Sequence, residues 1–175
     1  MLDMNPIYEN PGSVEVRPAH LNDAEAVLGI RNHAIEHSTA LWTETPQSPA
    51  QGAAWLAAHV DRGSAFVAET QGEVAGFAVY GPWRKLDGYR HTVDNSVYVR
   101  EGCHGLGIGS ALMTALISSA RQAGCHMMIA DIEAGNAASI RLHERFGFRH
   151  VGTVPEVGTK FGRWLDLTIM NLPLT

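Results

Sequence analysis

The chain has 175 residues, 45% of them hydrophobic, and a formal net charge of -5 at pH 7. This length suffices for the core of one domain, and the mildly acidic balance gives no general attraction to nucleic acids or anionic membranes. Cys103 and Cys125 do not make a disulfide framework, and the sequence shows neither a signal peptide nor an apolar run of about 18 residues. These features predict a cytoplasmic protein with no nucleic-acid or membrane partner.

The hydrophobic patterns predict one mixed α/β domain at 14–175, after a flexible leader at 1–13 that contains two prolines and no periodicity. The predicted elements are, in chain order, a strand at 14–17, two helices that follow Asn22 and Ser48, strands at 65–70, 73–80 and 92–99, a helix at 110–123, a strand at 127–132, a helix at 137–145, and strands at 148–154 and 164–172. The strand at 127–132 is almost continuously apolar, so we expect it to pair in parallel and to be buried on both faces.

Polar side chains mark the expected helix starts. Asn22 with Glu25, and Ser48 with Gln51, have the spacing of a capping box, in which each side chain bonds the backbone of the other residue. Asn136 is a suitable N-cap for the helix that follows it.

Three glycines at alternate positions, Gly105, Gly107 and Gly109, lie between the strand predicted at 92–99 and the helix predicted at 110–123. Without Cβ atoms in the way, several backbone N–H groups can converge on one point, and the dipole of the following helix adds positive potential. The pattern therefore predicts an anion site, most usefully for a pyrophosphate. A tight turn without a ligand is the alternative.

Two nucleotide-binding motifs match this loop poorly. The dinucleotide fingerprint G-x-G-x-x-G needs a glycine at Ser110 and follows its strand directly, whereas these glycines lie several residues beyond Val99. Asp131, at the end of the next strand, could otherwise imitate the ribose-binding acid of that fold. The Walker A pattern is absent because no Gly-Lys-Ser/Thr follows.

The loop and a second segment resemble the GNAT acetyltransferase superfamily. Its cofactor loop, Q/R-x-x-G-x-G/A, matches the segment from His104 to Gly109 at both glycine positions, although His104 replaces the usual Gln or Arg. The segment from Asn136 to Phe148 resembles the second signature, an Asn followed by a helix that ends in L-[YH]-x-x-x-G-F. The resemblance implies the acyl-CoA N-acyltransferase fold, a mixed and mostly antiparallel sheet flanked by helices.

Within this superfamily, the chain resembles the phosphinothricin and methionine sulfoximine acetyltransferases. The similarity rests on Tyr89–Val99, Arg141–Glu144 and Gly158–Leu167, and it extends over nearly all of 14–172. It implies acetyl-CoA as co-substrate, a small amino acid as acceptor and a homodimer. No metal is expected, because the nine histidines are scattered without a zinc-type spacing.

The resemblance also implies an acetyl-CoA site that extends over strand, loop and helix. The pantetheine arm is expected to pair with the main chain of the strand at 97–99, where one N–H would stabilise the oxyanion. The amides of the glycine loop are expected to hold the pyrophosphate. The implied cofactor-binding residues are Val97, Tyr98, Val99, Gly105, Leu106, Gly107, Ile108, Gly109, Ser110 and Asn136.

Acetyl transfer to an amine needs a base and, for the leaving thiolate, an acid. Asp94 occupies the position where phosphinothricin enzymes have Glu, and its shorter side chain favours proton transfer through a water. His143 matches a position where many relatives have Tyr, and it is expected to protonate the thiolate or to help deprotonate the amine. A solvent-facing carboxylate and a structural histidine are the alternatives.

The acceptor site is expected in the residues before the glycine loop. The loop at 81–91 clusters Arg84, Lys85 and Arg90 in an otherwise acidic protein, and the fork of an Arg matches an α-carboxylate, so we favour Arg84. The expected substrate-binding residues are Arg84, Lys85, Leu86, Asp94, Asn95 and Ser96. Four aromatic residues are candidates for either a pocket wall or the core, namely Trp42, Tyr89, Phe161 and Trp164.

These expectations combine into an N-acetyltransferase that moves acetyl from acetyl-CoA to the α-amine of a methionine sulfoximine, methionine sulfone or phosphinothricin type of compound, which would be a detoxification. Two alternatives remain open. One is an acetyltransferase for another small amine or a protein N-terminus, and the other is a non-catalytic acyl-CoA-binding protein.

Overall fold

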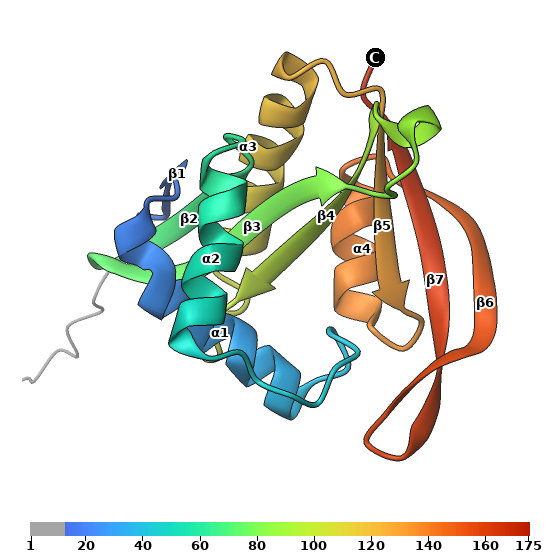
Figure 1. Cartoon of the computed structure of the whole chain (residues 1–175), viewed down its shortest axis with the longest axis horizontal. Helices are drawn as coiled ribbons and strands as arrows, with labels where there is room; N and C mark the ends of the chain where they lie inside the picture. Colours follow the sequence, from blue (N-terminus) through green and yellow to red (C-terminus); the bar gives the residue numbers. More distant parts are fainter. Residues whose placement is uncertain (1–12) are drawn as a thin grey trace, which may run out of the picture.

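The computed structural model describes residues 13–175, so nearly all of the predicted leader lies outside the described residues. The elements follow one another as β1 (Glu15–Pro18), η1 (Leu21–Asp23), α1 (Ala24–His37), α2 (Pro49–Val60), β2 (Ala65–Thr70), β3 (Glu73–Pro82), η2 (Asp87–Tyr89), β4 (Thr92–Val99), α3 (Ile108–Gln122), β5 (Met127–Glu133), α4 (Ala137–Arg145), β6 (Arg149–Lys160) and β7 (Arg163–Pro173). The predicted order of helices and strands is confirmed (Figure 1).

The strands form one sheet of seven in the order β1-β2-β3-β4-β5-β7-β6. Every neighbouring pair is antiparallel except β4 and β5, which run parallel. The predicted mixed, mostly antiparallel sheet flanked by helices is therefore confirmed, as is the parallel pairing of the apolar strand β5.

Two hydrophobic layers cover the sheet because successive strand side chains point to opposite faces. Phe77 and Val79 of β3 pack with Val27 and Leu56 of α1 and α2 on one face. The other face packs against the apolar stripe of α3 and against α4. Figure 1 shows α1 and α2 on the near side of the sheet, so the two faces present separate environments.

Two of the three predicted helix caps are confirmed. The backbone N–H of Gln51 donates to the Ser48 hydroxyl, and the side-chain Oε1 of Gln51 accepts from the backbone N–H of Ser48. The Asn136 side chain accepts from the backbone N–H of Ser139 at the start of α4. These caps depend on side chains within one turn, which is why the sequence pattern suffices to find them.

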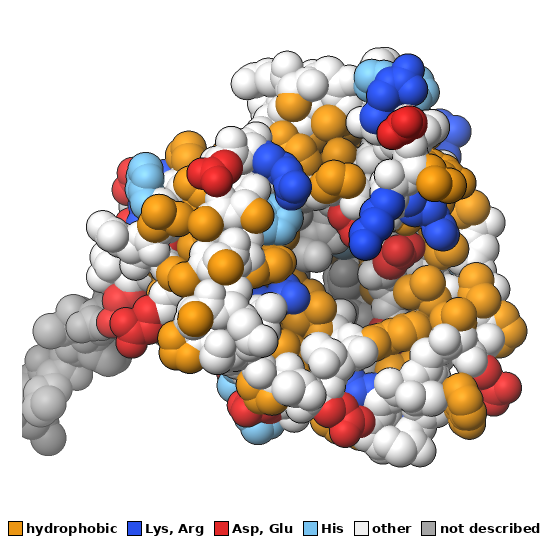
Figure 2. All heavy atoms as spheres, in the orientation of Figure 1, with side chains coloured by type: hydrophobic (Ala, Val, Ile, Leu, Met, Phe, Trp, Pro, Cys, Tyr) orange, Lys and Arg blue, Asp and Glu red, His pale blue; other side chains and the backbone are white. Residues whose placement is uncertain are grey.

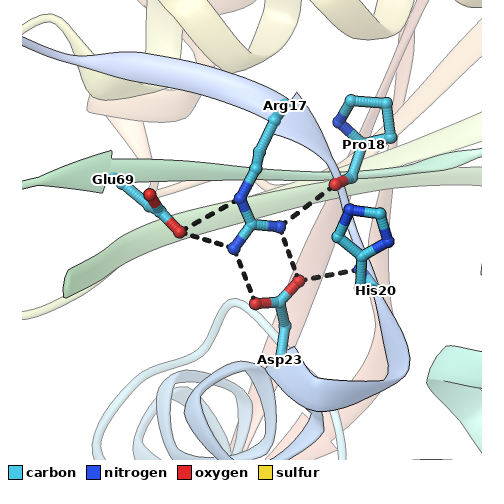
Figure 3. Close-up of polar contacts among 5 residues, drawn as sticks. All are labelled: Arg17, Pro18, His20, Asp23 and Glu69. Carbon is cyan, nitrogen blue, oxygen red and sulfur yellow. Dashed lines mark hydrogen bonds and ion pairs between the residues drawn. The ribbon is translucent and has the colours of Figure 1, made fainter. Parts of the chain in front are cut away.

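The predicted Asn22–Glu25 cap is wrong. The Asp23 carboxylate instead accepts from the backbone N–H of His20 and from the guanidinium of Arg17, which also bonds Glu69 of β2 (Figure 3). This long-range anchor makes the chain turn at 21–23, ahead of the predicted cap. A contact with a different strand thus decides where the turn begins.

The β6–β7 hairpin is longer than predicted. Strand β6 runs to Lys160 rather than ending at 154, with irregular register between Val154 and Gly158. Phe161 and Gly162 form its turn, both with positive φ (51° and 70°). Such a two-residue turn matches the twist of a hairpin. The prediction stopped early because the proline and glycine in 155–158 indicated a loop.

Strands β4 and β5 separate partway along their length. Their pairing joins Thr92–Asp94 to Met127–Ile129 and ends there, although β4 continues to Val99 and β5 to Glu133. Figure 1 shows the two arrows diverging toward their C-terminal ends. Among residues 13–175, the β5-facing edge of the second half of β4 is therefore without a strand partner.

Candidate active site

The predicted site residues on β4 divide between the two faces of the sheet. Tyr98 stacks on Phe77, with ring centroids 5.1 Å apart, on the α1–α2 face, and by alternation Asp94 and Ser96 share that face. Val97 and Val99 pack on the α3 side. The strand thus offers Asp94, Ser96 and Tyr98 to the α1–α2 face, and Val97, Val99 and the polar Asn95 to the α3–α4 face.

Asp94 lies where the β4–β5 pairing ends, opposite Gly81 of β3 and Ile129 of β5. Burial raises the pKa of its carboxyl to about 6, and the negative charge of Asp131 adds to the shift. A carboxylate with this pKa is ionised at neutral pH and is a better proton acceptor than an ordinary aspartate. Position and electrostatics therefore both suit a general base.

Asp131 follows on β5 on the same face as Asp94, two residues beyond the paired Ile129. Burial raises the pKa of its carboxyl, while the Trp83 indole and the positive charge of Arg84 oppose the rise. The Arg84 guanidinium lies over the Trp83 ring, 4.4 Å from its centroid. The structure therefore brings predicted Arg84 close to the carboxylate side of the site.

The other predicted residues of this loop are less engaged. The side chains of Lys85 and Leu86 are exposed, Leu86 at 72%, and Arg90 bonds the backbone oxygen of Asp87. Tyr89 packs edge-on against Trp83, with centroids 5.4 Å apart. Arg84 is exposed as well, but its guanidinium lies over the ring of the adjacent Trp83.

Sequence reasoning missed Arg31 of α1. Its guanidinium lies 4.2 Å from the centroid of the Trp55 ring, and its Nε donates to the side-chain Oε1 of Gln47 at 3.0 Å. Burial lowers its pKa, and the nearby Tyr98 hydroxyl counteracts the shift. The helical spacing could have identified Arg31, because it follows the buried Val27 by four residues and therefore lies on the inward face of the helix.

The glycine loop is open to approach. Gly105 and Gly107 have φ of 81° and 80°, and nothing lies within 4 Å of the Cβ position at either. Gly107 is the N-cap of α3, which begins at Ile108, two residues before the predicted start at Ser110. Leu106 is exposed and Ile108 is buried beneath the loop. Bare N–H groups at the start of a 15-residue helix fit a pyrophosphate.

His143 of α4 is buried, with 4% of its surface exposed. Its Nδ1 lies 2.8 Å from the backbone oxygen of Ser139, and its Nε2 lies 3.0 Å from Oδ1 of Asn95. Asn95 in turn donates from Nδ2 to the backbone oxygen of Ile129. The structure thus joins two predicted site residues, His143 and Asn95, and both ring nitrogens face protein acceptors.

A cavity of about 430 Å³ lies beside Asn136, at the far end of β5 from Asp94. Its lining residues are His37, Ser38, Thr39, Ala40, Glu133, Gly135, Asn136, Phe161 and Arg163. Figure 2 shows this face of the molecule hollowed between the α1–α2 side and the β5–β7 side, with basic side chains at the rim. Of the four candidate aromatic residues, Phe161 reaches the cavity, whereas Trp164 is 66% exposed.

No group of three or more His, Cys, Asp or Glu side chains is arranged to hold a metal ion among residues 13–175. Within the same range, no helix is both long and apolar enough to cross a bilayer.

Comparison with known proteins gives consistent matches. The model of the acetyltransferase (GNAT) family matches residues 28–148. An L-methionine sulfoximine/L-methionine sulfone acetyltransferase of Pseudomonas paraeruginosa is 48% identical over 93% of this chain and 95% of its own length. A phosphinothricin N-acetyltransferase of Streptomyces coelicolor is 38% identical over 94% and 99%. A solved structure of a Salmonella typhimurium acetyltransferase with its cofactor acetyl-CoA is 44% identical and superposes with a TM-score of 0.91 over 94% and 95%.

Proposed function

The chain belongs to the acetyltransferase (GNAT) family, and from this premise we propose that it acetylates the α-amine of a small amino acid with acetyl-CoA. The acceptor class we propose is methionine sulfoximine and methionine sulfone, with phosphinothricin as a related compound, on the strength of the relatives' activities. The observation that carries the proposal is Asp94, a partly buried carboxylate of raised pKa at the point where β4 and β5 separate.

The residues present fit acetyl-CoA, which supplies the acetyl thioester. The free edge of β4 at 97–99 offers main-chain groups to an extended pantetheine arm, as a further strand would. Gly105, Gly107 and the first amides of α3 offer N–H donors to the pyrophosphate. Asn136, the N-cap of α4, lines the cavity.

Asp94 is the proposed general base. An ammonium substrate must lose a proton before its nitrogen can attack the thioester carbon, and the ionised Asp94 carboxylate accepts that proton through a water. The neutral amine would then attack the thioester carbon, and an N–H of the free β4 edge would stabilise the negative oxygen once the C–N bond has formed. The C–S bond would break next, with the thiolate as leaving group and the second proton of the nitrogen passing to water. Both ring nitrogens of His143 face protein acceptors, so we propose that His143 positions Asn95, with transfer of its proton to the departing thiolate as the alternative role.

Arg84 is the proposed contact for the substrate α-carboxylate. Its guanidinium is held over Trp83 beside the Asp131 carboxylate, so a zwitterion would find a cation for its carboxylate and anions for its ammonium within one region. Lys85, Leu86, Asn95 and Ser96 remain proposed neighbours of the acceptor.

A homodimer in the cytoplasm is the remaining part of the proposal. Strands β6 and β7 expose several large apolar side chains, namely Val151, Val154, Val157 and Trp164. An edge strand with such a surface favours association with a second copy, since exposed apolar patches on soluble proteins commonly mark interfaces.

The test is release of free thiol from acetyl-CoA in the presence of individual amines. We expect turnover with methionine sulfoximine and methionine sulfone, and weaker or no turnover with polyamines and peptides. Turnover with peptides but no α-amino acid would favour a protein N-terminal acetyltransferase. Tight acetyl-CoA binding without turnover of any amine would favour a non-catalytic acyl-CoA-binding protein.

A further inference from the structure

Lys160, at the end of β6, is buried with only 1% of its surface exposed, although it carries a charge. Its Nζ donates to the backbone oxygens of Ser38 and Leu41, each at 2.6 Å, and lies 4.7 Å from the centroid of the Phe161 ring. Fully buried lysines are rare unless they are paired. Here the partners are two carbonyl groups of the connection between α1 and α2.

Three further contacts join this connection to the same end of the sheet. The Glu44 carboxylate accepts from the backbone N–H of Phe161, and the Thr39 hydroxyl donates to Glu133. Trp42 lies against Gly158 so closely that a Cβ there would sit 2.1 Å from the ring. Segment 38–44 is thus held to the β6–β7 hairpin through Lys160, Phe161 and Gly158, and to β5 through Glu133.

The fastened segment forms part of the cavity beside Asn136. Ser38, Thr39 and Ala40 line it on one side, and Phe161 and Arg163 of the hairpin line it on the other. Lys160 connects these two walls, because it is part of the hairpin and its ammonium donates to Ser38 and Leu41 of segment 38–44. The distance between the walls therefore depends on the two Lys160 hydrogen bonds together with the Glu44–Phe161 and Trp42–Gly158 contacts.

We propose that Lys160 is a positioning residue that holds segment 38–44 against the β6–β7 hairpin, narrows the opening beside Asn136, and so limits the size of an acceptor that reaches Asp94 along β5 from that opening. This inference rests on the proposed acetyltransferase function for its kinetic readout. Removing the ammonium leaves two carbonyl groups without their donor, so the segment moves outward to reach water and the opening widens.

The experiment compares Lys160→Met with the wild-type enzyme. We expect faster amide hydrogen exchange across 38–45, a rise of about tenfold in KM for methionine sulfoximine and a change in kcat below about threefold. The ratio of kcat/KM for a dipeptide to that for methionine sulfoximine should rise. A merely structural lysine would lower the melting temperature without separating KM from kcat.

Two further variants make the result decisive. Thr168→Val removes a buried hydroxyl contact between β6 and β7 without touching segment 38–44, and we expect it to leave KM and exchange in 38–45 unchanged. Gly158→Ala displaces Trp42 and should reproduce the Lys160→Met effects, which provides the test if Lys160→Met does not fold. Unchanged exchange and KM in Gly158→Ala and in folded Lys160→Met overturn the proposal. If the wild-type enzyme acetylates no amino acid, the proposed function fails, and the exchange data alone decide whether Lys160 fastens the segment.

Discussion

The Nε2 atom of His143 on α4 lies 3.0 Å from Oδ1 of Asn95 on β4. Because Asn95 also donates to the backbone oxygen of Ile129, a continuous chain of hydrogen bonds joins α4, β4 and β5 at the place where the two strands separate. Burial lowers the pKa of His143, while its bond to the Ser139 backbone opposes the shift. A neutral imidazole has one N–H for the two acceptors it faces. A second proton on the His143 ring is therefore favoured by these contacts and disfavoured by burial of the charge.

Replacement of His143 tests whether this chain of bonds is structural. His143→Phe keeps the edge-on packing against Phe148 but removes the single N–H that a neutral imidazole shares between Asn95 Oδ1 and the Ser139 oxygen. We expect the free energy of unfolding in urea to fall by about 2 kcal/mol and kcat to fall with an unchanged alkaline limb of the pH–rate profile. Ser139→Ala is the matched control. A His143→Phe variant with wild-type stability and a lost alkaline limb would instead identify His143 as the proton donor.

Asp94 should control the acid side of the pH–rate profile. The ionised form accepts the proton, so kcat/KM for the amino acid is expected to rise with pH through about 6. Asp94→Asn should lower kcat by about 10²–10⁴-fold while acetyl-CoA binding, measured by calorimetry, is retained. Asp131→Asn removes a neighbouring negative charge and should move the acid limb to lower pH. An unchanged rate in Asp94→Asn would refute the assignment of the base.

The same carboxyl should affect stability with a definite sign. Its pKa is raised from 3.8 to about 6 in the folded state, so the fold favours the protonated form. The resulting stabilisation is present below pH 3.8 and is lost as pH rises through about 6. At pH 8 the ionised carboxylate costs at most about 3 kcal/mol, and Asp94→Asn should therefore unfold at higher urea than wild type at pH 8. At pH 4 the difference should nearly vanish; an equal difference at both pH values would contradict the shift.

Arg84 should determine affinity for the acceptor rather than for acetyl-CoA. Arg84→Ala removes the guanidinium that lies over Trp83, and we expect KM for methionine sulfoximine to rise more than tenfold, roughly the loss of one charge-assisted hydrogen bond of about 1.5–3 kcal/mol. KM for acetyl-CoA should stay unchanged. Arg90→Ala, at an exposed position in the same loop, is the control for loss of one positive charge. Equal effects of the two variants would indicate general electrostatic attraction instead.

Predictions from sequence succeeded where a few adjacent residues decide the structure. Ser48 with Gln51 and Asn136 with Ser139 form their caps within one turn, and β4 has the predicted bounds because its pattern is local. The Asn22–Glu25 cap failed because Arg17 and Glu69 from distant strands hold Asp23 instead. The end of β6 was missed because its turn at Phe161–Gly162 follows residues 155–158, whose proline and glycine are typical of a loop.

The order of elements, the open glycine loop and the family signatures were determined by the sequence itself, since each depends on residues close together along the chain. Only the tertiary structure decided the chemistry around them. The pKa of Asp94 depends on burial and on Asp131 of another strand, and Lys160 finds its partners 119 and 122 residues away. Burial and charge act through space, and the spacing of residues in a sequence does not encode which distant groups the fold will bring within a few ångströms.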